Sequence, residues 1–423
     1  MSAAGKHFSG WRVLAGCMIL MIFPGGLLSY TSGLFLYPIC EEFGFATSVF
    51  SLTLTVSAAV NALTSAFLVQ YLSKNSAKSM KILMLISAFI TCGGFACMGL
   101  CGKLWQFFVM AAVWNLGYNM LTYVPVGMMV SNWFVEKRAM MTGIAFAGGN
   151  LGGAIFNAVM SNIIAGAGWR TAYRFGGSLC LIFTLIAIAL VRRSPAEYGE
   201  KAYGSERVVS APGEENEATA RWEGIDKKEA MKTPALRLLV VIFFITGIYS
   251  AGIANYVVTY LCGGGWKITA AGLVMTVYTL FGIIGNSAGG AVLSKIGLRK
   301  GMWIAVVTIL LSLVCLALSV AIHPLAFVFA ALLGIACVLS VLIPSQSVAA
   351  IFGTKGFAGI YGYTYAFYLI GCAVSTPFIA FLSEKAGFIA AWAIIGVLLV
   401  IIGLFYSKCF AYGKKLREEN QTL

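Results

Sequence analysis

Most of this chain consists of long runs that contain no Asp, Glu, Lys or Arg. The longest extends from Gly301 to Thr354, and another, Ala139 to Trp169, follows the charged turn at Glu136-Lys137-Arg138. About 20 apolar residues in a helix are enough to cross a bilayer. A chain built largely from such runs must bury them in lipid or against one another. We therefore predict an all-α polytopic membrane protein.

Eleven runs of this kind divide the chain into two similar halves. Six precede Arg192: Val13 to Cys40, Phe43 to Ser73, Ile82 to Gly102, Leu104 to Val135, Ala139 to Trp169 and Phe175 to Val191. Five follow: Leu238 to Trp266, Ile268 to Ser294, Gly301 to Thr354, Gly356 to Ser383 and Ala386 to Ser407. With a helical rise of about 1.5 Å per residue, the longest run exceeds one crossing, and we expect a break near His323-Pro324. The prediction is twelve transmembrane helices in two pseudo-symmetric six-helix bundles.

Composition excludes most other classes of protein. Hydrophobic residues make up 60% of the chain, charged residues 10%, and the mean hydropathy is +0.89, which a soluble domain cannot have. The net charge of +14 comes from basic residues scattered between apolar runs, so no nucleic-acid partner is expected. The 11 cysteines form no C-x-x-C pair, and there is no histidine cluster. We expect no metal, no cofactor and no catalytic site, and hence not an enzyme.

The basic residues also predict the orientation in the membrane. An even number of spans puts both termini on one side, together with the polar segment between the halves. That side holds 24 Lys and Arg and the other side 5, so the termini and the linker are expected in the cytoplasm of a multi-pass plasma-membrane protein. The expected division is a bundle at 1–191, a solvated linker at 192–236 ending in a short helix, a second bundle at 237–411, and a tail at 412–423. We expect the first run to stay as a span, since it is longer than a signal-peptide core.

An internal repeat relates the two halves. Tyr123-Val124-Pro125 in the fourth span corresponds to Leu342-Ile343-Pro344 in the tenth, and Trp133 corresponds to Phe352 at the same offset of 219. Near the second span, Leu72-Ser73-Lys74 matches Leu293-Ser294-Lys295 at an offset of 221. Two homologous bundles around a midplane site are the arrangement of many alternating-access carriers. The repeat thus predicts a carrier.

Glycine and proline positions predict where helices touch and where they end. Gly148 and Gly152 lie four apart in the fifth span, as do Gly149 and Gly153, so each pair leaves one helix face open to close contact with a neighbouring helix. The helix is expected to end at Gly168-Trp169-Arg170. Pro24-Gly25-Gly26 predicts a break at half depth in the first span.

These residues resemble the major facilitator superfamily over all twelve spans. The pattern Gly290-x-x-x-Ser294-Lys295-x-Gly297-x-Arg299-Lys300 looks like that family's cytoplasmic turn signature, with Ser294 where an acidic residue is usual. Trp133-Phe134, Lys137-Arg138, the glycine run and Gly168-Trp169-Arg170 are similar to the branch of monocarboxylate porters and oxalate/formate antiporters. The resemblance implies that spans one, four, seven and ten line the pathway. It assigns a structural or gating role to Arg138, Gly148, Gly149, Gly152, Gly153, Trp169, Arg170, Gly290, Lys295, Gly297 and Arg299.

The interior departs from that branch in its charges. Carriers of the branch commonly bind a carboxylate with a buried cation, whereas the eighth span here has no Lys or Arg, and Lys355 lies only at the entrance of the eleventh. Neutral polar groups occur at mid-span instead, where an unpaired amide would be costly in lipid. The candidate substrate-binding residues are Tyr30, Asn115, Tyr118, Asn119, Tyr249, Tyr256, Tyr278, Tyr365 and Tyr368. Tyr365 and Tyr368 fall on one helical stripe with Tyr361.

The leading prediction is a monomeric secondary transporter of small organic acids of the monocarboxylate type, working as a symporter or antiporter. The alternative is a facilitator or exporter of a neutral or zwitterionic small molecule, aromatic compounds included. A ligand sensor built on a transporter fold is a third alternative, although the linker and tail are too short for a signalling domain. The expected partners are the small-molecule substrate and the lipid bilayer.

Overall fold

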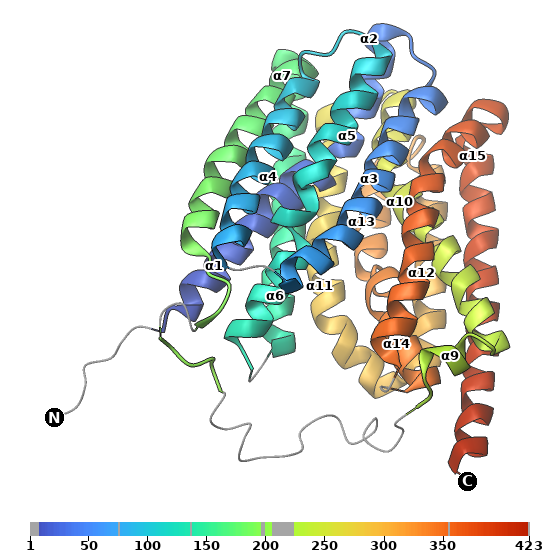
Figure 1. The fold of residues 1–423 in the computed structure, drawn as a ribbon. Coiled ribbons are helices and arrows are strands. Elements are labelled where there is room, and N and C mark those ends of the chain that lie inside the picture. Colours follow the sequence, from blue (N-terminus) through green and yellow to red (C-terminus); the bar gives the residue numbers. More distant parts are fainter. Residues whose placement is uncertain are drawn as a thin grey trace. The chain divides into compact units, whose positions relative to one another are not determined.

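The computed structural model describes residues 8–74, 77–135, 138–195, 199–204, 224–353 and 356–421. Nearly all of them are helical (Figure 1). The elements in chain order are α1 (Gly10–Leu20), the π-helix η1 (Met21–Ser29), α2 (Ser32–Phe43), α3 (Thr47–Lys74), α4 (Ala77–Met98), α5 (Leu104–Leu121), α6 (Tyr123–Trp133), α7 (Arg138–Leu190), α9 (Lys227–Ala230), α10 (Pro234–Gly263), α11 (Ile268–Ile296), α12 (Leu298–Leu318), α13 (Pro324–Ile335), α14 (Val338–Phe352) and α15 (Phe357–Gln421).

The predicted number of spans is confirmed. Within the described residues, ten helical stretches are long and apolar enough to cross a membrane. Two of them, in α7 and α15, are each divided by one glycine with non-helical backbone, Gly168 (φ 80°) and Gly387 (φ 81°). Ten stretches and two divisions give twelve spans. The break expected near Pro324 is also present, because α12 ends at Leu318 and Pro324 is the first residue of α13.

Helix α12 shows how the outer surface suits lipid. Five large apolar residues along it are between 48% and 58% exposed, at a spacing of three or four residues: Ile304, Val307, Leu311, Val314 and Leu318. Residues at this spacing form one stripe of a helix. A continuous apolar stripe this long is unfavourable in water but matches the acyl chains of a bilayer.

Contacts within the chain group the residues into two compact units. The first unit is Met1–Ser32 with Val60–Gly213, and the second is Gly33–Ala59 with Glu214–Leu423. Residues Gly33–Ala59, which include the end of the first span and the start of the second, therefore pack with the second half of the sequence. Thr55 Oγ1 donates to Ala373 O at 2.7 Å, and the Ser48 amide donates to the Glu384 carboxylate at 2.8 Å.

The first span widens at Pro24 rather than breaking there. Proline has no N–H and its ring crowds the carbonyl four residues earlier, which is Leu20. Helix α1 ends at Leu20, and the π-helix η1 takes over from Met21 to Ser29 with Pro24 inside it. The wider winding accommodates the ring without interrupting the helix. The actual break follows at Tyr30-Thr31, before α2 begins.

The glycines of α7 make the backbone contact that their spacing predicts. A Cβ placed on Gly152 would overlap Ile22 O and lie 3.0 Å from Gly26 Cα, and a Cβ on Gly148 would lie 2.9 Å from Met18 O. Helix α7 therefore crosses α1 and η1 with glycine against glycine. Any side chain at Gly152 would push the two helices apart.

The second unit repeats this crossing with different residues. A Cβ on Gly371 of α15 would overlap Phe244 O and lie 3.2 Å from Gly247 Cα of α10. The sequence offset from Gly152 to Gly371 equals the offset that relates the fourth and tenth spans. The duplicated halves thus share a close helix crossing at equivalent positions, although the sequence around it has diverged.

The structure describes part of the linker and most of the C-terminal segment. The short helix expected at the end of the linker is α9, Lys227–Ala230, and α15 continues through the expected tail as far as Gln421. Lys137, Lys355, residues 205–223 and the side chain of Arg138 lie outside the described residues, so the interpretation of these positions stays a prediction.

Candidate functional site

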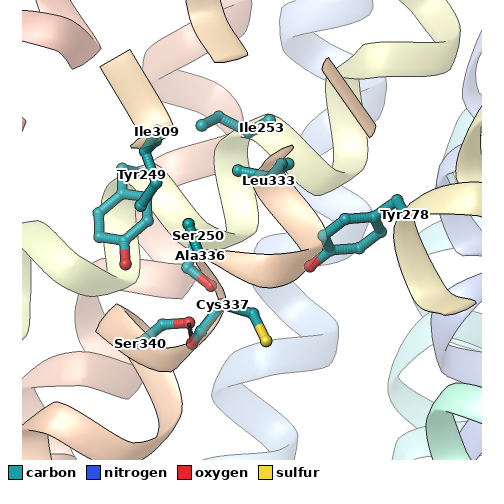
Figure 2. A pocket seen from close by; sticks show the side chains of 9 residues that line it. All are labelled: Tyr249, Ser250, Ile253, Tyr278, Ile309, Leu333, Ala336, Cys337 and Ser340. Carbon is teal, nitrogen blue, oxygen red and sulfur yellow. Dashed lines mark hydrogen bonds between the residues drawn. The ribbon is translucent and has the colours of Figure 1, made fainter. Parts of the chain in front are cut away.

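A cavity lies inside the second unit at the level where the tenth span is broken. Figure 2 shows Tyr249 and Tyr278 on opposite sides of it, with serines and a cysteine between them. The lining residues are Tyr249, Ser250, Ile253, Tyr278, Ile309, Leu333, Ala336, Cys337 and Ser340. About 20 Å³ of the cavity is open to the centres of water molecules. One buried water needs roughly 10–15 Å³ by this measure, so the space holds one small polar group.

The break in the tenth span positions the polar lining. Helix α13 ends at Ile335 and α14 begins at Val338, so two residues separate the helices. Glycines of α11 lie against this point: a Cβ on Gly285 would be 2.6 Å from Ile335 O. The Cys337 thiol lies 3.3 Å from Asn286 Oδ1 and 3.7 Å from Gly282 O, within hydrogen-bonding reach for sulfur. The close approach of α11 thus holds Cys337 at the cavity.

The cavity is polar but carries no formal charge. Its polar groups are two phenols, two serine hydroxyls and a thiol, and none of the nine lining residues is ionised at neutral pH. Tyr249 is only 3% exposed, and its hydroxyl makes no hydrogen bond within 3.5 Å, although the Ser340 hydroxyl lies beside it. The Ser340 hydroxyl donates to Cys337 O at 2.9 Å (Figure 2). A buried unpaired hydroxyl costs about 1–3 kcal/mol, which a ligand or water bound here would recover.

The tyrosine stripe of the eleventh span forms as expected but does not line this cavity. On α15, Tyr361 stacks on Tyr365 with centroids 5.6 Å apart, and Tyr365 stacks on Tyr368 at 5.2 Å. Tyr365 is 40% exposed, and Tyr361 also meets Phe243 edge-on at 6.1 Å. The stripe is therefore a continuous column of aromatic rings in the second unit.

Tyr256 lies deep in the second unit, away from the cavity lining. Its side chain is fully buried, its hydroxyl has no hydrogen-bond partner, and its ring lies 6.3 Å from that of Phe388. One turn later on α10, Tyr260 donates to Ala317 O at 3.1 Å. Of the predicted tyrosines, the structure brings together Tyr249 and Tyr278, and it leaves Tyr256 apart from them.

The asparagines of the fourth span turn their amide N–H groups to the backbone. Asn115 donates to Ala111 O in its own helix at 2.8 Å, whereas Asn119 donates across to Asn61 O at 2.6 Å and to Thr64 Oγ1 at 2.9 Å. The Asn115 side-chain oxygen is buried and accepts no hydrogen bond. These contacts link α5 to α3, so Asn119 joins two helices whatever else it does.

Tyr118 and Tyr30 also lie in the first unit. Tyr118 is 6% exposed and meets Trp114 edge-on at 5.6 Å. Tyr30 is half-buried at the end of η1, where its ring would lie 3.7 Å from a Cβ on Gly149. The fourth span is broken beside these residues, since Pro125 crowds the carbonyl of Leu121 and α5 ends there.

The predicted structural residues fall at turns and crossings. Trp169 is 3% exposed, and the Arg170 guanidinium lies 4.3 Å from its ring centroid, a cation–π contact. Gly297 (φ 84°) joins α11 to α12, and a left-handed backbone of this kind favours glycine. Three further predicted positions lie in or near this turn: Gly290 with open space around it, and Lys295 and Arg299 with exposed side chains. Gly153 O accepts from Asn157 Nδ2 at 2.8 Å.

Sequence reasoning missed three polar residues of the cavity: Ser250, Cys337 and Ser340. Cys337 and Ser340 lie three apart in the longest apolar run, so they share a helix face. That spacing, close to Pro344, is the signal that could have drawn attention to them. Ser250 directly follows Tyr249 and gave no separate signal.

Comparison with known proteins places this chain among transporters. The sequence profile of the family described as Major Facilitator Superfamily matches residues 18–264 and 250–421, which together span most of the chain. A solved bacterial homologue of the human lysosomal transporter Spinster, in an inward-facing and unoccupied conformation, superposes with a TM-score of 0.72 at 15% identity, covering 98% of this chain and 99% of that one. A solved nucleoside transporter, NupG, gives a TM-score of 0.73 at 13% identity over 94% and 100%.

Relatives with curated descriptions are distant and match only in part. The MFS-type transporter 1 of Ophiocordyceps sp. is 25% identical over 41% of this chain and 34% of its own length. The riboflavin transporter RibJ of Trypanosoma cruzi is 29% identical over 18% of this chain and 16% of its own length. The uncharacterized transporter ESBP6 of Saccharomyces cerevisiae is 32% identical over 22% and 14%. The matches thus cover about a third or less of the relatives' own lengths.

Proposed function

The chain belongs to the major facilitator superfamily, and from that premise we propose that it carries an uncharged or zwitterionic, ring-bearing small molecule across the membrane by alternating access. The protein is a membrane transporter of that superfamily, and the class of its substrate is the proposal. We further propose that it works as a monomer in the plasma membrane, with both termini and the linker in the cytoplasm, in keeping with the 24 to 5 distribution of Lys and Arg.

The observation that carries this proposal is the cavity lined by hydroxyl groups and no charge. The buried, unpartnered hydroxyl of Tyr249 can donate to a carbonyl or ring nitrogen of a substrate, and Tyr278 offers a second phenol across the cavity. The space holds one polar group, so it suits the polar tip of a larger molecule. Aromatic walls with a few hydroxyls favour planar, weakly polar compounds over anions.

The relatives support a ring-bearing substrate. One protein similar in sequence is named for riboflavin, and one similar in fold is named for nucleosides. Both names denote compounds with a planar heterocycle and hydroxyl groups, which the cavity chemistry can accommodate. The two names therefore favour the class of hydroxylated heterocyclic compounds as substrates.

Small monocarboxylates are the second candidate. The turn beginning at Trp133-Phe134 and the motif Gly168-Trp169-Arg170, similar to monocarboxylate and oxalate/formate carriers, favour this class. The charge-free spans leave a carboxylate without a buried cation, and a lone buried anion is very costly. An acid would therefore bind in its protonated, uncharged form and carry its own proton in symport, or exchange for another acid in antiport.

Uptake into proteoliposomes distinguishes the two candidates. The panel is riboflavin, uridine and adenosine beside lactate, pyruvate, acetate and oxalate, with and without an inward proton gradient or counter-substrate. We expect saturable uptake of a ring compound. Saturable uptake of an acid alone, driven by the gradient or by exchange, would instead establish the second candidate.

Cys337 provides a reporter that does not depend on radiolabel. Its thiol lines the cavity, so a bound substrate should slow its alkylation by N-ethylmaleimide, whereas the exposed Cys97 of α4 should alkylate at an unchanged rate. Site-resolved mass spectrometry measures both residues in one sample. If no transported compound slows the alkylation of Cys337, this cavity is not part of the binding site.

A further inference from the structure

The polar groups of the cavity differ in the hydrogen bonds that they can still make. A carbonyl oxygen can only accept, so a hydroxyl or thiol bonded to one must be the donor. The Cys337 thiol lies 3.7 Å from Gly282 O and 3.3 Å from Asn286 Oδ1, and both of these atoms are acceptors. The hydrogen of the thiol is therefore already used within the protein.

Ser340 is likewise used as a donor. Its hydroxyl donates to Cys337 O at 2.9 Å (Figure 2). A serine hydroxyl has one hydrogen and two lone pairs, so the Ser340 oxygen can only accept from a ligand in the cavity. A group that binds beside Ser340 has to supply the hydrogen.

Tyr249 complements Ser340. Its hydroxyl makes no hydrogen bond within 3.5 Å, although the Ser340 hydroxyl lies beside it. Figure 2 shows both side chains on the same side of the cavity, with the Tyr249 hydroxyl directed towards Ser340. The phenol can therefore donate to a ligand at the place where Ser340 can accept from it. We call Tyr249 and Ser340 the cavity pair.

The other two polar groups do not fix a polarity. Tyr278 lies across the cavity from Tyr249 (Figure 2), and the Ser250 hydroxyl lies beside that of Tyr368. A hydroxyl can donate or accept according to the rotation of its hydrogen. Discrimination between ligands of different hydrogen-bonding polarity therefore depends on the cavity pair.

We propose that the cavity pair recognises an edge of the substrate on which a hydrogen-bond acceptor and a donor are adjacent, as in a lactam or an imide. The carbonyl of such an edge accepts from Tyr249, and its N–H donates to Ser340. Water both donates and accepts, so it matches the pair in the same way when no substrate is bound. The inference rests on the proposed function, because it takes the polar tip of the substrate to enter this cavity.

The cavity pair also discriminates between charged and uncharged acids. A carboxylate has only acceptor oxygens, so it matches Tyr249 but faces the lone pairs of Ser340. A protonated carboxylic acid carries a carbonyl and an O–H side by side and matches both residues. Lactams and uncharged acids therefore share the required edge, whereas carboxylates and N-methylated lactams lack it. One unmatched group in a buried site should weaken binding by about 10- to 100-fold.

Protection of Cys337 from N-ethylmaleimide measures binding to the cavity without transport, because Cys337 lines it. The first probes are uridine and 3-methyluridine, in which a methyl group replaces the imide hydrogen. The second probe is acetate at pH 6 and pH 7, which separates an acid from a lactam as the source of the edge. Each alkylation rate is divided by the rate without probe at the same pH, and the concentration that gives half-protection is compared.

Uridine should give half-protection at a concentration about 10- to 100-fold lower than 3-methyluridine. Acetate should need about tenfold more at pH 7 than at pH 6, because the protonated fraction falls tenfold per pH unit above the pKa. Equal protection by uridine and 3-methyluridine, or no protection by any probe, would overturn the proposal. So would protection by acetate that does not change with pH.

Two variants separate the two members of the pair. Ser340→Ala removes the acceptor, so it should weaken uridine about tenfold and leave 3-methyluridine unchanged, which abolishes the preference. Tyr249→Phe removes the donor that both compounds use, so it should weaken both and keep the preference. A preference that survives Ser340→Ala would come from the bulk of the methyl group and would contradict the proposal.

Ser345→Ala is the matched control for Ser340→Ala. Ser345 lies on the same helix, α14, and its hydroxyl donates to Leu342 O at 3.0 Å, three residues earlier, as that of Ser340 does to Cys337 O. It does not line the cavity, so this variant should behave as the wild type. Uptake into proteoliposomes is measured separately. Selective protection without uptake would contradict the proposed function alone, whereas uptake of uridine with equal protection by the two nucleosides would contradict the cavity pair alone.

Discussion

The two units use the same backbone crossing but fill it with different polar groups. Gly26 with Gly152 and Gly247 with Gly371 bring helices together, and Gly152 and Gly371 are equivalent positions of the repeat. In the first unit, the amides of Asn115 and Asn157 donate to backbone carbonyls, and the side-chain oxygens of Asn61, Asn115 and Asn157 are buried without a hydrogen bond. In the second unit, the buried groups without a hydrogen bond are hydroxyls and indole N–H groups, those of Tyr249, Tyr256, Tyr406, Thr246, Thr259, Trp266 and Trp392.

The difference shows which parts of a duplicated carrier are constrained. A crossing with backbone against backbone tolerates only glycine, so it persists in both halves. Polar side chains inside a bundle have to satisfy a weaker condition, that each finds some partner. The two halves use different residues for this purpose: the first uses asparagine amides, and the second has buried tyrosine hydroxyls that a ligand could bind. Under the proposed function, the hydroxyl groups of the second unit bind the polar part of the substrate.

The largest expected effect tests the shared crossing. Gly152→Ala and Gly371→Ala each place a Cβ into a carbonyl of the facing helix, so each should lower the free energy of unfolding by about 3 kcal/mol and reduce the yield of monodisperse protein. Gly143→Ala and Gly362→Ala, which have open space around them, are the matched controls. Thermal unfolding in detergent compares them. If only one crossing is sensitive, the equivalence of the halves is wrong.

The next prediction separates recognition from structure. Tyr249→Phe removes a hydroxyl that the cavity leaves for the substrate and should raise KM about tenfold, or about 1.4 kcal/mol of binding, with little change in unfolding temperature. Asn119→Ala breaks hydrogen bonds between α5 and α3 and should do the opposite, lowering stability with KM unchanged for the folded fraction. Kinetics and unfolding are measured on the same preparations. If Asn119→Ala raised KM and Tyr249→Phe only lowered stability, the substrate would be recognised in the first unit.

A smaller effect tests the second shared feature, the glycine turns. Gly168→Ala and Gly387→Ala both force a residue with a Cβ into a left-handed backbone, and neither position is crowded. Each substitution should lower the free energy of unfolding by about 1–3 kcal/mol, and the two effects should be equal within error. Thermal unfolding again provides the measurement. Unequal costs would show that one turn is held by its surroundings and the other is not.

The smallest effect concerns the unpartnered hydroxyls. Tyr256→Phe removes a buried hydroxyl that makes no hydrogen bond within 3.5 Å, although the Ser51 hydroxyl lies beside it, so its effect on the unfolding free energy should be about zero. Tyr260→Phe, one turn away, removes a bond to Ala317 O and should cost about 1 kcal/mol. If Tyr256→Phe lowered the unfolding free energy as much as Tyr260→Phe, the Tyr256 hydroxyl would have an ordered hydrogen-bond partner.

The sequence predicts the fold well because membrane spans are governed by a simple requirement. Backbone groups in lipid must be paired, so a charge-free run of sufficient length becomes a helix, and turn glycines and Pro324 separate the helices. The crossing of α7 was also predictable, since glycine spacing directly encodes close approach. Pro24 shows the limit: a proline can be accommodated by a π-helix as well as by a break, and local sequence does not decide between them.

The candidate site was predictable only in part. The mid-span positions of Tyr249 and Tyr278 predict a place in the pathway, and the two residues do share a cavity, but the same position in Tyr256 gives a side chain that lies apart from it. Cys337 and Ser340 were missed because their exposure to the cavity comes from the break in the tenth span. No proline lies within that two-residue break; the close approach of α11 at Gly285 accompanies it. Such a tertiary contact between distant segments leaves no periodic signal.

The short connections on the side opposite the linker have a practical consequence for reagents. The fifth and sixth spans join through Gly168 alone and the eleventh and twelfth through Gly387, and the other connections on that side contain at most five non-helical residues, as at 99–103 and 319–323. A protease needs a longer extended stretch to cut efficiently. An antibody raised against a linear peptide would likewise find little to bind. Reagents that recognise this side of the protein should therefore be selected against the folded transporter, because its epitopes are made of several turns together.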